Sequence, residues 1–220
     1  MSQDFNIELA IPKLRQMVKS FPKAAMFALA DEGYSSAFEQ LVSCIISIRT
    51  YDEVSLPVSR QLFEVASTPQ AISKLSVAEI ESLIAESTYA EKKAGQIKAI
   101  AQKIIDEYDG DLPCDESVML SFKGVGVKCA HLALGIACQQ PYISVDVHVH
   151  RVTNRWGYVA TKTPEKTTKA LESKLPQQYW IELNSLLVPF GKHICTRNEP
   201  RCSDCGLNQI CSQVDVTRHR

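Results

Sequence analysis

The sequence predicts an all-α fold, because helix start signals and helical apolar periodicity recur along most of its length. Two capping boxes, Ser36-Ala-Phe-Glu39 and Ser76-Val-Ala-Glu79, precede apolar runs. Between residues 94 and 108, apolar side chains recur at three- and four-residue steps, the spacing of one helix face. The chain has 220 residues and is 45% hydrophobic, enough to build a core in one domain or in two small lobes.

Capping residues and prolines set the other helix boundaries. Gly110 stands where the helix that includes 94–108 needs a C-terminal cap. Thr163 is expected to cap a helix whose first residue is Pro164, where a missing N–H costs nothing. A last helix is expected to run through Tyr179 and to stop before Pro189.

Residues 143–150 are the exception to the helical trend. Ile143 and three valines alternate there with polar residues, so an extended strand would place Asp146, His148 and His150 on one face as a plausible metal-ligand set. If a helix begins near Asp146 instead, its carboxylate caps that helix and the two histidines lie on different faces. An isolated strand in a helical protein would leave its backbone unpaired, which favours the helix.

The eight cysteines fall into two groups. One group crowds into 17 residues with the spacing Cys195-x6-Cys202-x2-Cys205-x5-Cys211, and this predicts a metal site. Four thiolates suit zinc or a [4Fe–4S] cluster, and a single Cys-x2-Cys between wider gaps favours the cluster. The other four are expected to act as small buried hydrophobic residues without chemistry: Cys44, Cys114, Cys129 and Cys138.

A Gly-Val-Gly turn at 124–126 joins two helical segments and predicts a helix-hairpin-helix element at about 115–137. Such a turn at a helix N-terminus suits a phosphate, and the element binds a DNA backbone without recognising sequence. A plain helix–helix turn is the alternative. Lys128 follows the second glycine by two residues and is a candidate phosphate contact, a solvated side chain or a nucleophile.

Net charge and hydropathy argue against a strongly basic protein, a membrane-spanning protein and a secreted protein. The net charge is −1, although residues 121–160 hold four basic side chains against one acid. No stretch approaches the roughly 20 apolar residues of a membrane span, and the N-terminus lacks a basic segment followed by an apolar run. The expectation is a cytoplasmic monomer, associated with the nucleoid if the source is bacterial, with no membrane partner.

Together, the glycine hairpin, the lysine after it, the Val-Asp-x-His segment and the cysteine spacing resemble the endonuclease III family of DNA glycosylases and abasic-site lyases. The resemblance extends from about residue 36 to residue 211. It implies a two-lobed helix-hairpin-helix DNA glycosylase fold. A six-helix lobe would span 31–140, and an iron–sulfur lobe would combine 1–30 with 141–220. The implied partner is double-stranded DNA with damaged bases or abasic sites.

The resemblance also implies roles for single residues. Lys128 stands at the position of the nucleophilic lysine, and Asp146 at that of the essential aspartate. The four clustered cysteines stand at the positions of the [4Fe–4S] ligands. The residues expected to contact DNA are Arg49, Lys123, Gly124, Val125, Gly126, His148 and Lys192.

Three positions depart from the family pattern. Phe122-Lys123 replaces a usual Leu-Pro before the glycines, which leaves the turn feasible but less rigid. Arg49 replaces a glutamine that fills the gap left by the extruded base, and its long side chain with several donors is suited to the same task. Thr88 stands where a glycine is usual.

The implied activity is removal of oxidised pyrimidines, followed by β-elimination through a lysine Schiff base. Two alternatives stay open. One is a mismatch-specific adenine or thymine glycosylase of the same superfamily, which typically lacks the lysine. The other is a non-catalytic iron–sulfur protein that binds DNA.

Overall fold

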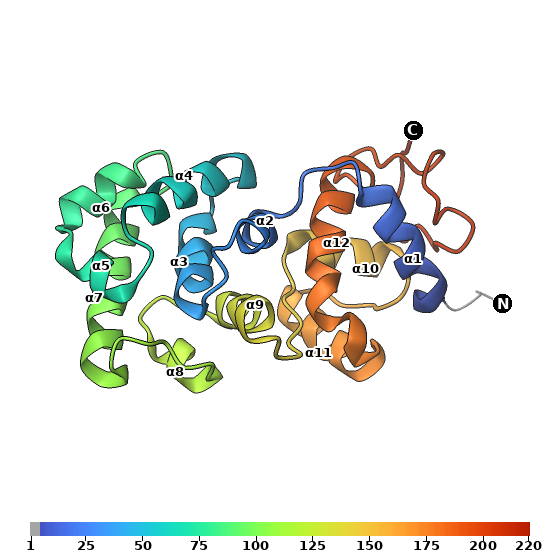
Figure 1. The fold of residues 1–220 in the computed structure, drawn as a ribbon. Helices are drawn as coiled ribbons and strands as arrows, with labels where there is room; N and C mark the ends of the chain where they lie inside the picture. The colour runs from blue at the N-terminus through green and yellow to red at the C-terminus, as the bar shows by residue number, and fades with distance from the viewer. Residues whose placement is uncertain (1–4) are drawn as a thin grey trace. The chain divides into compact units, whose positions relative to one another are not determined.

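The computed structural model describes residues 5–220, and within that range it contains helices and loops but no strand, which confirms the all-α prediction (Figure 1). None of these helices is long and apolar enough to cross a membrane. The chain divides into two compact units, Ala25–Tyr142 and the described residues of Met1–Ala24 together with Ile143–Arg220. Residues 1–4 of the expected lobe 1–30 lie outside the described residues.

The unit Ala25–Tyr142 holds eight α-helices. Four of them have only six or seven residues, so the count exceeds the six that the family resemblance implies. The helices are α2 (Ala25–Asp31), α3 (Ala37–Ser47), α4 (Asp52–Val65), α5 (Pro69–Lys74), α6 (Val77–Leu83), α7 (Ala90–Tyr108), α8 (Glu116–Ser121) and α9 (Val127–Cys138).

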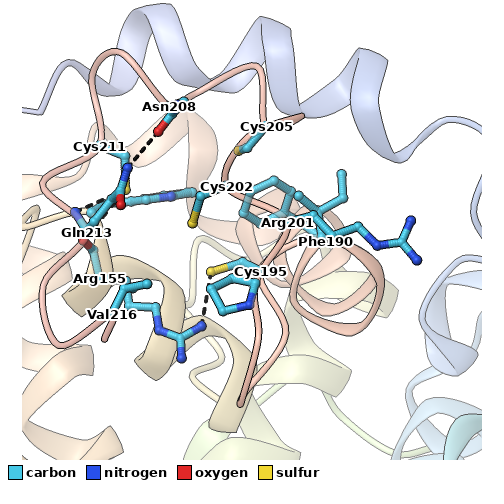
Figure 2. A pocket seen from close by; sticks show the side chains of 13 residues that line it. Arg155, Phe190, Cys195, Arg201, Cys202, Cys205, Asn208, Cys211, Gln213 and Val216 are labelled. Atoms are coloured by element: carbon cyan, nitrogen blue, oxygen red, sulfur yellow. Dashed lines mark hydrogen bonds between the residues drawn. The ribbon is translucent and has the colours of Figure 1, made fainter. Parts of the chain in front are cut away.

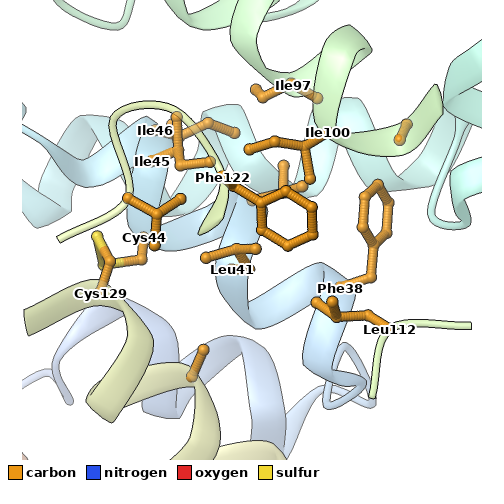
Figure 3. Packing of buried hydrophobic residues seen from close by; sticks show 14 of the residues in the cluster. Phe38, Leu41, Cys44, Ile45, Ile46, Ile97, Ile100, Leu112, Phe122 and Cys129 are labelled. Carbon is orange, nitrogen blue, oxygen red and sulfur yellow. A yellow bond between two sulfur atoms is a disulfide. The ribbon is translucent and has the colours of Figure 1, made fainter. Parts of the chain in front are cut away.

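Both predicted capping boxes form. Oγ of Ser36 accepts from the Glu39 N–H at 3.2 Å, and the Glu39 carboxylate accepts from the Ser36 N–H at 2.9 Å. Ser76 and Glu79 repeat the arrangement at the start of α6. The helix that Ser36 starts, α3, is buried on nearly all sides and forms the centre of the apolar core (Figure 3).

The end of α7 differs from the prediction by one residue. The cap is Asp109, which adopts the left-handed conformation at φ 53°. Gly110 follows at φ 82°, and its N–H reaches back to the Ile104 carbonyl at 3.0 Å. Two successive left-handed residues close this helix, and the glycine is the second of them.

The other unit is built from α1 (Ile7–Val18), α10 (Val147–Arg155), α11 (Pro164–Lys174), a short 3-10 helix (Gln177–Tyr179) and α12 (Trp180–His193). Thr163 caps α11 and Pro164 begins it, as predicted. The prediction that the last helix stops before Pro189 is wrong, because α12 continues to His193. Leu186, Leu187 and Phe190 are buried around the proline, and this packing outweighs one missing helical hydrogen bond.

The four scattered cysteines are paired, contrary to the expectation that they act as free buried residues. Cys44 of α3 is disulfide-bonded to Cys129 of α9 within the apolar core (Figure 3). Cys114 is bonded to Cys138, so a second disulfide joins the two ends of the segment that contains the glycine hairpin. Sequence spacing gave no signal for these pairs, since the partners are 85 and 24 residues apart.

Candidate functional site

The glycine hairpin is a tight turn between α8 and α9. Phe122 ends α8 and is buried in the core, and its carbonyl accepts from the Val125 N–H at 3.1 Å. Gly124 has φ +83°, a conformation that side chains with a Cβ rarely adopt. Gln96 of α7 donates from Nε2 to the Lys123 carbonyl at 2.9 Å, which fixes the turn to the rest of the unit.

The N-terminus of α9 has no capping side chain. Its N-cap residue is Gly126, and a Cβ built there would have no heavy atom within 4 Å. The first backbone N–H groups of α9 are therefore approachable, and the helix dipole adds partial positive charge at this end. Val125 is the buried residue of the turn, whereas Lys123, Gly124 and Gly126 are exposed. This arrangement suits an anion such as a phosphate.

Positive charge also lines a groove between α7 and the hairpin. The groove contains Lys92 and Lys103 from the helix and Lys123 from the turn, with no acidic residue in its lining. Nζ of Lys103 lies 5.4 Å from the ring centroid of Phe122. The three lysines bring positive charge to this groove, and Nζ of Lys103 also lies 3.7 Å from the Glu107 carboxylate.

Lys128 is the second residue of α9 and is exposed. Its neighbour in sequence, Cys129, is buried in the disulfide to Cys44. The lysine therefore stands on a helix that is covalently held to α3, next to the uncapped hairpin.

Asp146 caps α10. Its Oδ1 accepts from the His148 N–H at 2.9 Å and from the Val149 N–H at 2.8 Å, and the residue is half-buried. The helical alternative for residues 143–150 is therefore correct and the strand is not. A carboxylate at this end of a helix is stabilised by both hydrogen bonds and the helix dipole.

The two histidines after Asp146 have separate surroundings. Nδ1 of His148 lies 3.2 Å from a guanidinium nitrogen of Arg151. Nδ1 of His150 lies 2.6 Å from the Thr167 hydroxyl. Across residues 5–220, no three His, Cys, Asp or Glu side chains converge closely enough to hold a metal ion, so the separate metal site considered at 146–150 does not form.

The four clustered cysteines have free thiols and line one pocket in the loop after α12 (Figure 2). Burial raises the pKa of the thiols of Cys202 and Cys205, and raises that of Cys211 to about 11. A metal ion that binds such thiols stabilises the thiolate form, and their protons are released to solvent. The remaining lining residues are Arg155, Trp156, Phe190, Ile194, Pro200, Arg201, Asn208, Gln213 and Val216.

Arg155, the last residue of α10, joins that helix to the cysteine loop. One guanidinium nitrogen lies 3.5 Å from Sγ of Cys195 and donates to the Thr196 carbonyl at 2.5 Å. The other donates to the Arg197 carbonyl at 2.6 Å. The arginine holds the start of the loop in place and supplies positive charge beside the sulfurs. Lys192 lies in the last turn of α12, just before this loop.

Arg49 lies in the connection between α3 and α4, in the left-handed conformation at φ 56°. Its guanidinium donates to the Tyr89 hydroxyl at 3.2 Å. Lys93 and Thr88 hold this turn from α7 and the residues before it. Sequence reasoning did not identify Tyr89 or Lys93 as site residues. The one signal for Lys93 was its place on the apolar side of a predicted helix.

The predicted site residues thus fall into both units. Arg49, Lys128 and the hairpin residues 123–126 belong to Ala25–Tyr142. Asp146, His148, Lys192 and the four clustered cysteines belong to the other unit.

Comparisons with known proteins identify relatives of this chain. Residues 42–177 match the model of the HhH-GPD superfamily of base excision DNA repair proteins. The chain is 36% identical over 197 residues to Endonuclease III of Thermotoga maritima, covering 90% of this chain and 89% of that protein. It is 38% identical over 183 residues to the chloroplastic Endonuclease III homolog 1 of Arabidopsis thaliana, covering 79% of this chain and 48% of that protein.

Among solved structures, the chain superposes on a non-covalent Endonuclease III–DNA complex with a TM-score of 0.81 and 25% identity. The superposition covers 94% of both chains. The hairpin, the fold and the similarity over nine-tenths of the chain lead to one assignment. The chain belongs to the endonuclease III family of the HhH-GPD superfamily, the DNA glycosylases of base excision repair.

Proposed function

We propose that the protein is a bifunctional DNA glycosylase and abasic-site lyase with Lys128 as its nucleophile. Its substrate would be double-stranded DNA that contains an oxidised pyrimidine or an abasic site, bound by a cytoplasmic monomer. The observation that carries the proposal is the position of Lys128, an exposed residue in the first turn of α9, beside an uncapped hairpin. The hairpin would hold the DNA backbone and so bring the amine to the sugar of the damaged nucleotide.

The reaction requires the target nucleotide to leave the base stack, at a cost of a few kcal/mol that is lowest for damaged bases. The Lys128 amine would attack C1′ of the deoxyribose, the bond to the base would break, and a Schiff base would result. Loss of a proton from C2′ would then expel the 3′ phosphate by β-elimination. Asp146 would stabilise positive charge on the sugar or accept the proton of the attacking amine.

Within this proposal, residues 31–140 form the lobe that carries the helix-hairpin-helix element, and 1–30 with 141–220 form the iron–sulfur lobe. Arg49 would fill the gap left by the extruded base and contact the opposite base. The other DNA contacts would be Lys123, Gly124, Val125, Gly126, His148 and Lys192.

The four clustered cysteines would hold a [4Fe–4S] cluster. The four thiols line one pocket, and the single Cys-x2-Cys between wider gaps favours a cluster over one zinc ion. The apolar walls at Trp156 and Phe190 and the positive charge of Arg155 fit a buried, negatively charged group. The cluster would shape the loop around Arg197 and Arg201 for phosphate contact and take no part in bond breaking.

Borohydride trapping on an oligonucleotide with one abasic site tests the function. The wild type is expected to form a covalent adduct, and Lys128→Ala is expected to form none. Lys123→Ala is the matched control, because it removes an exposed lysine from the same hairpin and should keep the adduct. A trapped adduct with Lys128→Ala, or no adduct with the wild type, would contradict the lyase assignment and favour a mismatch glycosylase without a Schiff base.

Metal analysis tests the cofactor independently of activity. We expect about four irons per chain, together with visible absorption that is lost in Cys202→Ala. Ser203→Ala changes the exposed neighbour in the same loop and should retain both. One zinc per chain and no iron would contradict the cluster.

A further inference from the structure

The connection between α3 and α4 presents Arg49 from a strained turn. Arg49 is exposed and has φ +56°, a conformation unfavourable for a residue with a Cβ. A single residue keeps this conformation only where surrounding contacts hold it. Besides hydrogen bonds within the turn itself, the contacts that hold Arg49 come from one neighbouring segment, residues 88–93.

Lys93 is the main contact of this kind. Its side chain is buried, with 4% of the residue exposed. Nζ donates to the carbonyls of Ile46 at 2.6 Å and Ile48 at 2.9 Å, and to the Thr50 hydroxyl at 3.1 Å. These acceptors lie on both sides of Arg49 in the chain. One ammonium group therefore fixes the residue before the turn and the residue after it.

The position of Lys93 has a clear electrostatic reason. The last carbonyls of a helix have no helical donor, and they form the negative end of its dipole. The ammonium group lies at that end of α3 and donates to the Ile46 carbonyl in the last turn and to the carbonyl of the C-cap residue Ile48. Lys93 is thus a C-terminal cap for α3, contributed by another helix, α7.

Thr88 adds a second connection to the same turn. Its hydroxyl donates to the Arg49 carbonyl at 2.9 Å, and its N–H donates to the Thr50 hydroxyl at 3.1 Å. The next residue, Tyr89, is also left-handed, at φ +60°, and its hydroxyl accepts from the Arg49 guanidinium. Backbone and side chain of Arg49 are therefore both held by the segment that leads into α7.

We propose that Lys93 is a positioning residue that holds the Arg49 turn in place and thereby sets how Arg49 discriminates among opposite bases. This inference rests on the proposed function, in which Arg49 contacts DNA. A contact to one base edge requires the side chain to start from one backbone position, because small displacements lose directional hydrogen bonds. Without the ammonium group, the strained turn would relax, and the backbone position from which the Arg49 side chain extends would no longer be fixed.

The test measures single-turnover excision of one lesion placed opposite each of the four bases. It compares the wild type, Lys93→Met, Arg49→Ala and the double variant. Lys98→Met is the matched control. Lys98 also lies in α7 and caps the end of a helix, α5, by donating to the carbonyls of Ser73 and Leu75, away from Arg49. Amide hydrogen exchange at Thr50 and Thr88 is measured on the same proteins without DNA.

We expect Lys93→Met to reduce the preference among opposite bases by about tenfold, to the profile of Arg49→Ala. The double variant should then match Arg49→Ala alone, because both changes remove the same interaction. Exchange at Thr50 and Thr88 should become faster in Lys93→Met, while Lys98→Met should keep the wild-type preference and exchange at these two amides.

Two results would overturn the inference. One is a Lys93→Met protein with the wild-type opposite-base profile or unchanged exchange at Thr50 and Thr88. The other is a loss of preference in Lys93→Met that persists undiminished in the Arg49→Ala background. Borohydride trapping of each variant separates this failure from failure of the proposed function, because an adduct through Lys128 does not require Arg49.

Discussion

Cys44 of α3 and Cys129 of α9 form a disulfide directly beside Lys128 in the sequence. The disulfide thereby joins α3, at the centre of the core, covalently to α9, the helix that follows the hairpin. In the chain-entropy model, closing a loop of this length lowers the entropy of the unfolded chain and stabilises the fold by about 4 to 5 kcal/mol.

The first prediction concerns this disulfide. Replacing both cysteines by alanine should lower the free energy of unfolding of the oxidised protein, measured by chemical denaturation. Adding a thiol reductant should lower the stability of the wild type by more, because it opens both disulfides. The Cys114–Cys138 pair is the comparison, because it closes a shorter segment of 24 residues and should contribute less. A wild-type unfolding curve that does not respond to the reductant would refute the prediction.

The second prediction separates the capping role of Asp146 from its chemistry. Asn caps helices about as well as Asp, so Asp146→Asn should fold with a small loss of stability. Loss of the negative charge should lower the rate of base excision at least about a hundredfold. Single-turnover excision and thermal unfolding measure the two effects.

Asp115→Asn is the control for this prediction. Asp115 also caps a helix, α8, by accepting from the Val118 N–H at 3.0 Å. It should show a similarly small change in stability with nearly wild-type excision. Equal losses of activity in both variants would mean that Asp146 acts only as a cap.

The third prediction compares the two glycines of the hairpin. Gly124→Ala places a Cβ 2.9 Å from Nε2 of Gln96 at φ +83°, and should lower stability by about 1 kcal/mol or more. Gly126→Ala meets open space at φ −101°, so its stability should change little. Its methyl group would stand before the first N–H groups of α9 and should weaken binding to undamaged duplex DNA. Chemical denaturation measures the stability of each variant, and DNA binding at several salt concentrations measures its affinity. Equal stabilities of the two variants would contradict the prediction.

The fourth prediction concerns pH. Burial lowers the pKa of Lys93 to about 8, from 10.5 for a free lysine. Between these values the unfolded chain binds more protons than the folded protein, so this residue makes stability rise with pH from about 8 to about 10.5. The stability of the wild type relative to Lys93→Met should therefore increase over that range and stay level below it. Urea denaturation at a series of pH values measures the difference, and a difference that falls with pH would show that the hydrogen bonds to Lys93 outweigh its burial.

Much of the fold followed from short-range sequence signals. Ser36, Ser76 and Thr163 bond to residues three positions later, so their effect is complete within one helical turn. The segment 143–150 shows the limit of periodicity. Its alternation fits a strand, yet Asp146 begins a helix there because its carboxylate accepts two N–H groups and Val149 packs into a helical core, while Val147 is exposed.

Long-range contacts were the part that the sequence did not predict. Pro189 lies inside a helix because its neighbours are buried against other elements. Cys44 and Cys129 meet because α3 packs on α9. Lys93 donates to carbonyls more than forty residues away, so its place on the apolar side of a predicted helix could not show which groups it would contact.

Helix α10 has a consequence for oxidative damage. Its N-terminal cap is Asp146, and its last residue is Arg155, which contacts the cysteine loop. A helix of nine residues is about 13 Å long and behaves as a short rod. Oxidation of the cysteine loop would break the Arg155 contacts at the C-terminal end of α10. The Asp146 carboxylate at the N-terminal end of the helix would then shift. If Asp146 serves base excision as proposed, oxidation of the cysteines would lower the rate of excision even though the proposed mechanism uses no sulfur.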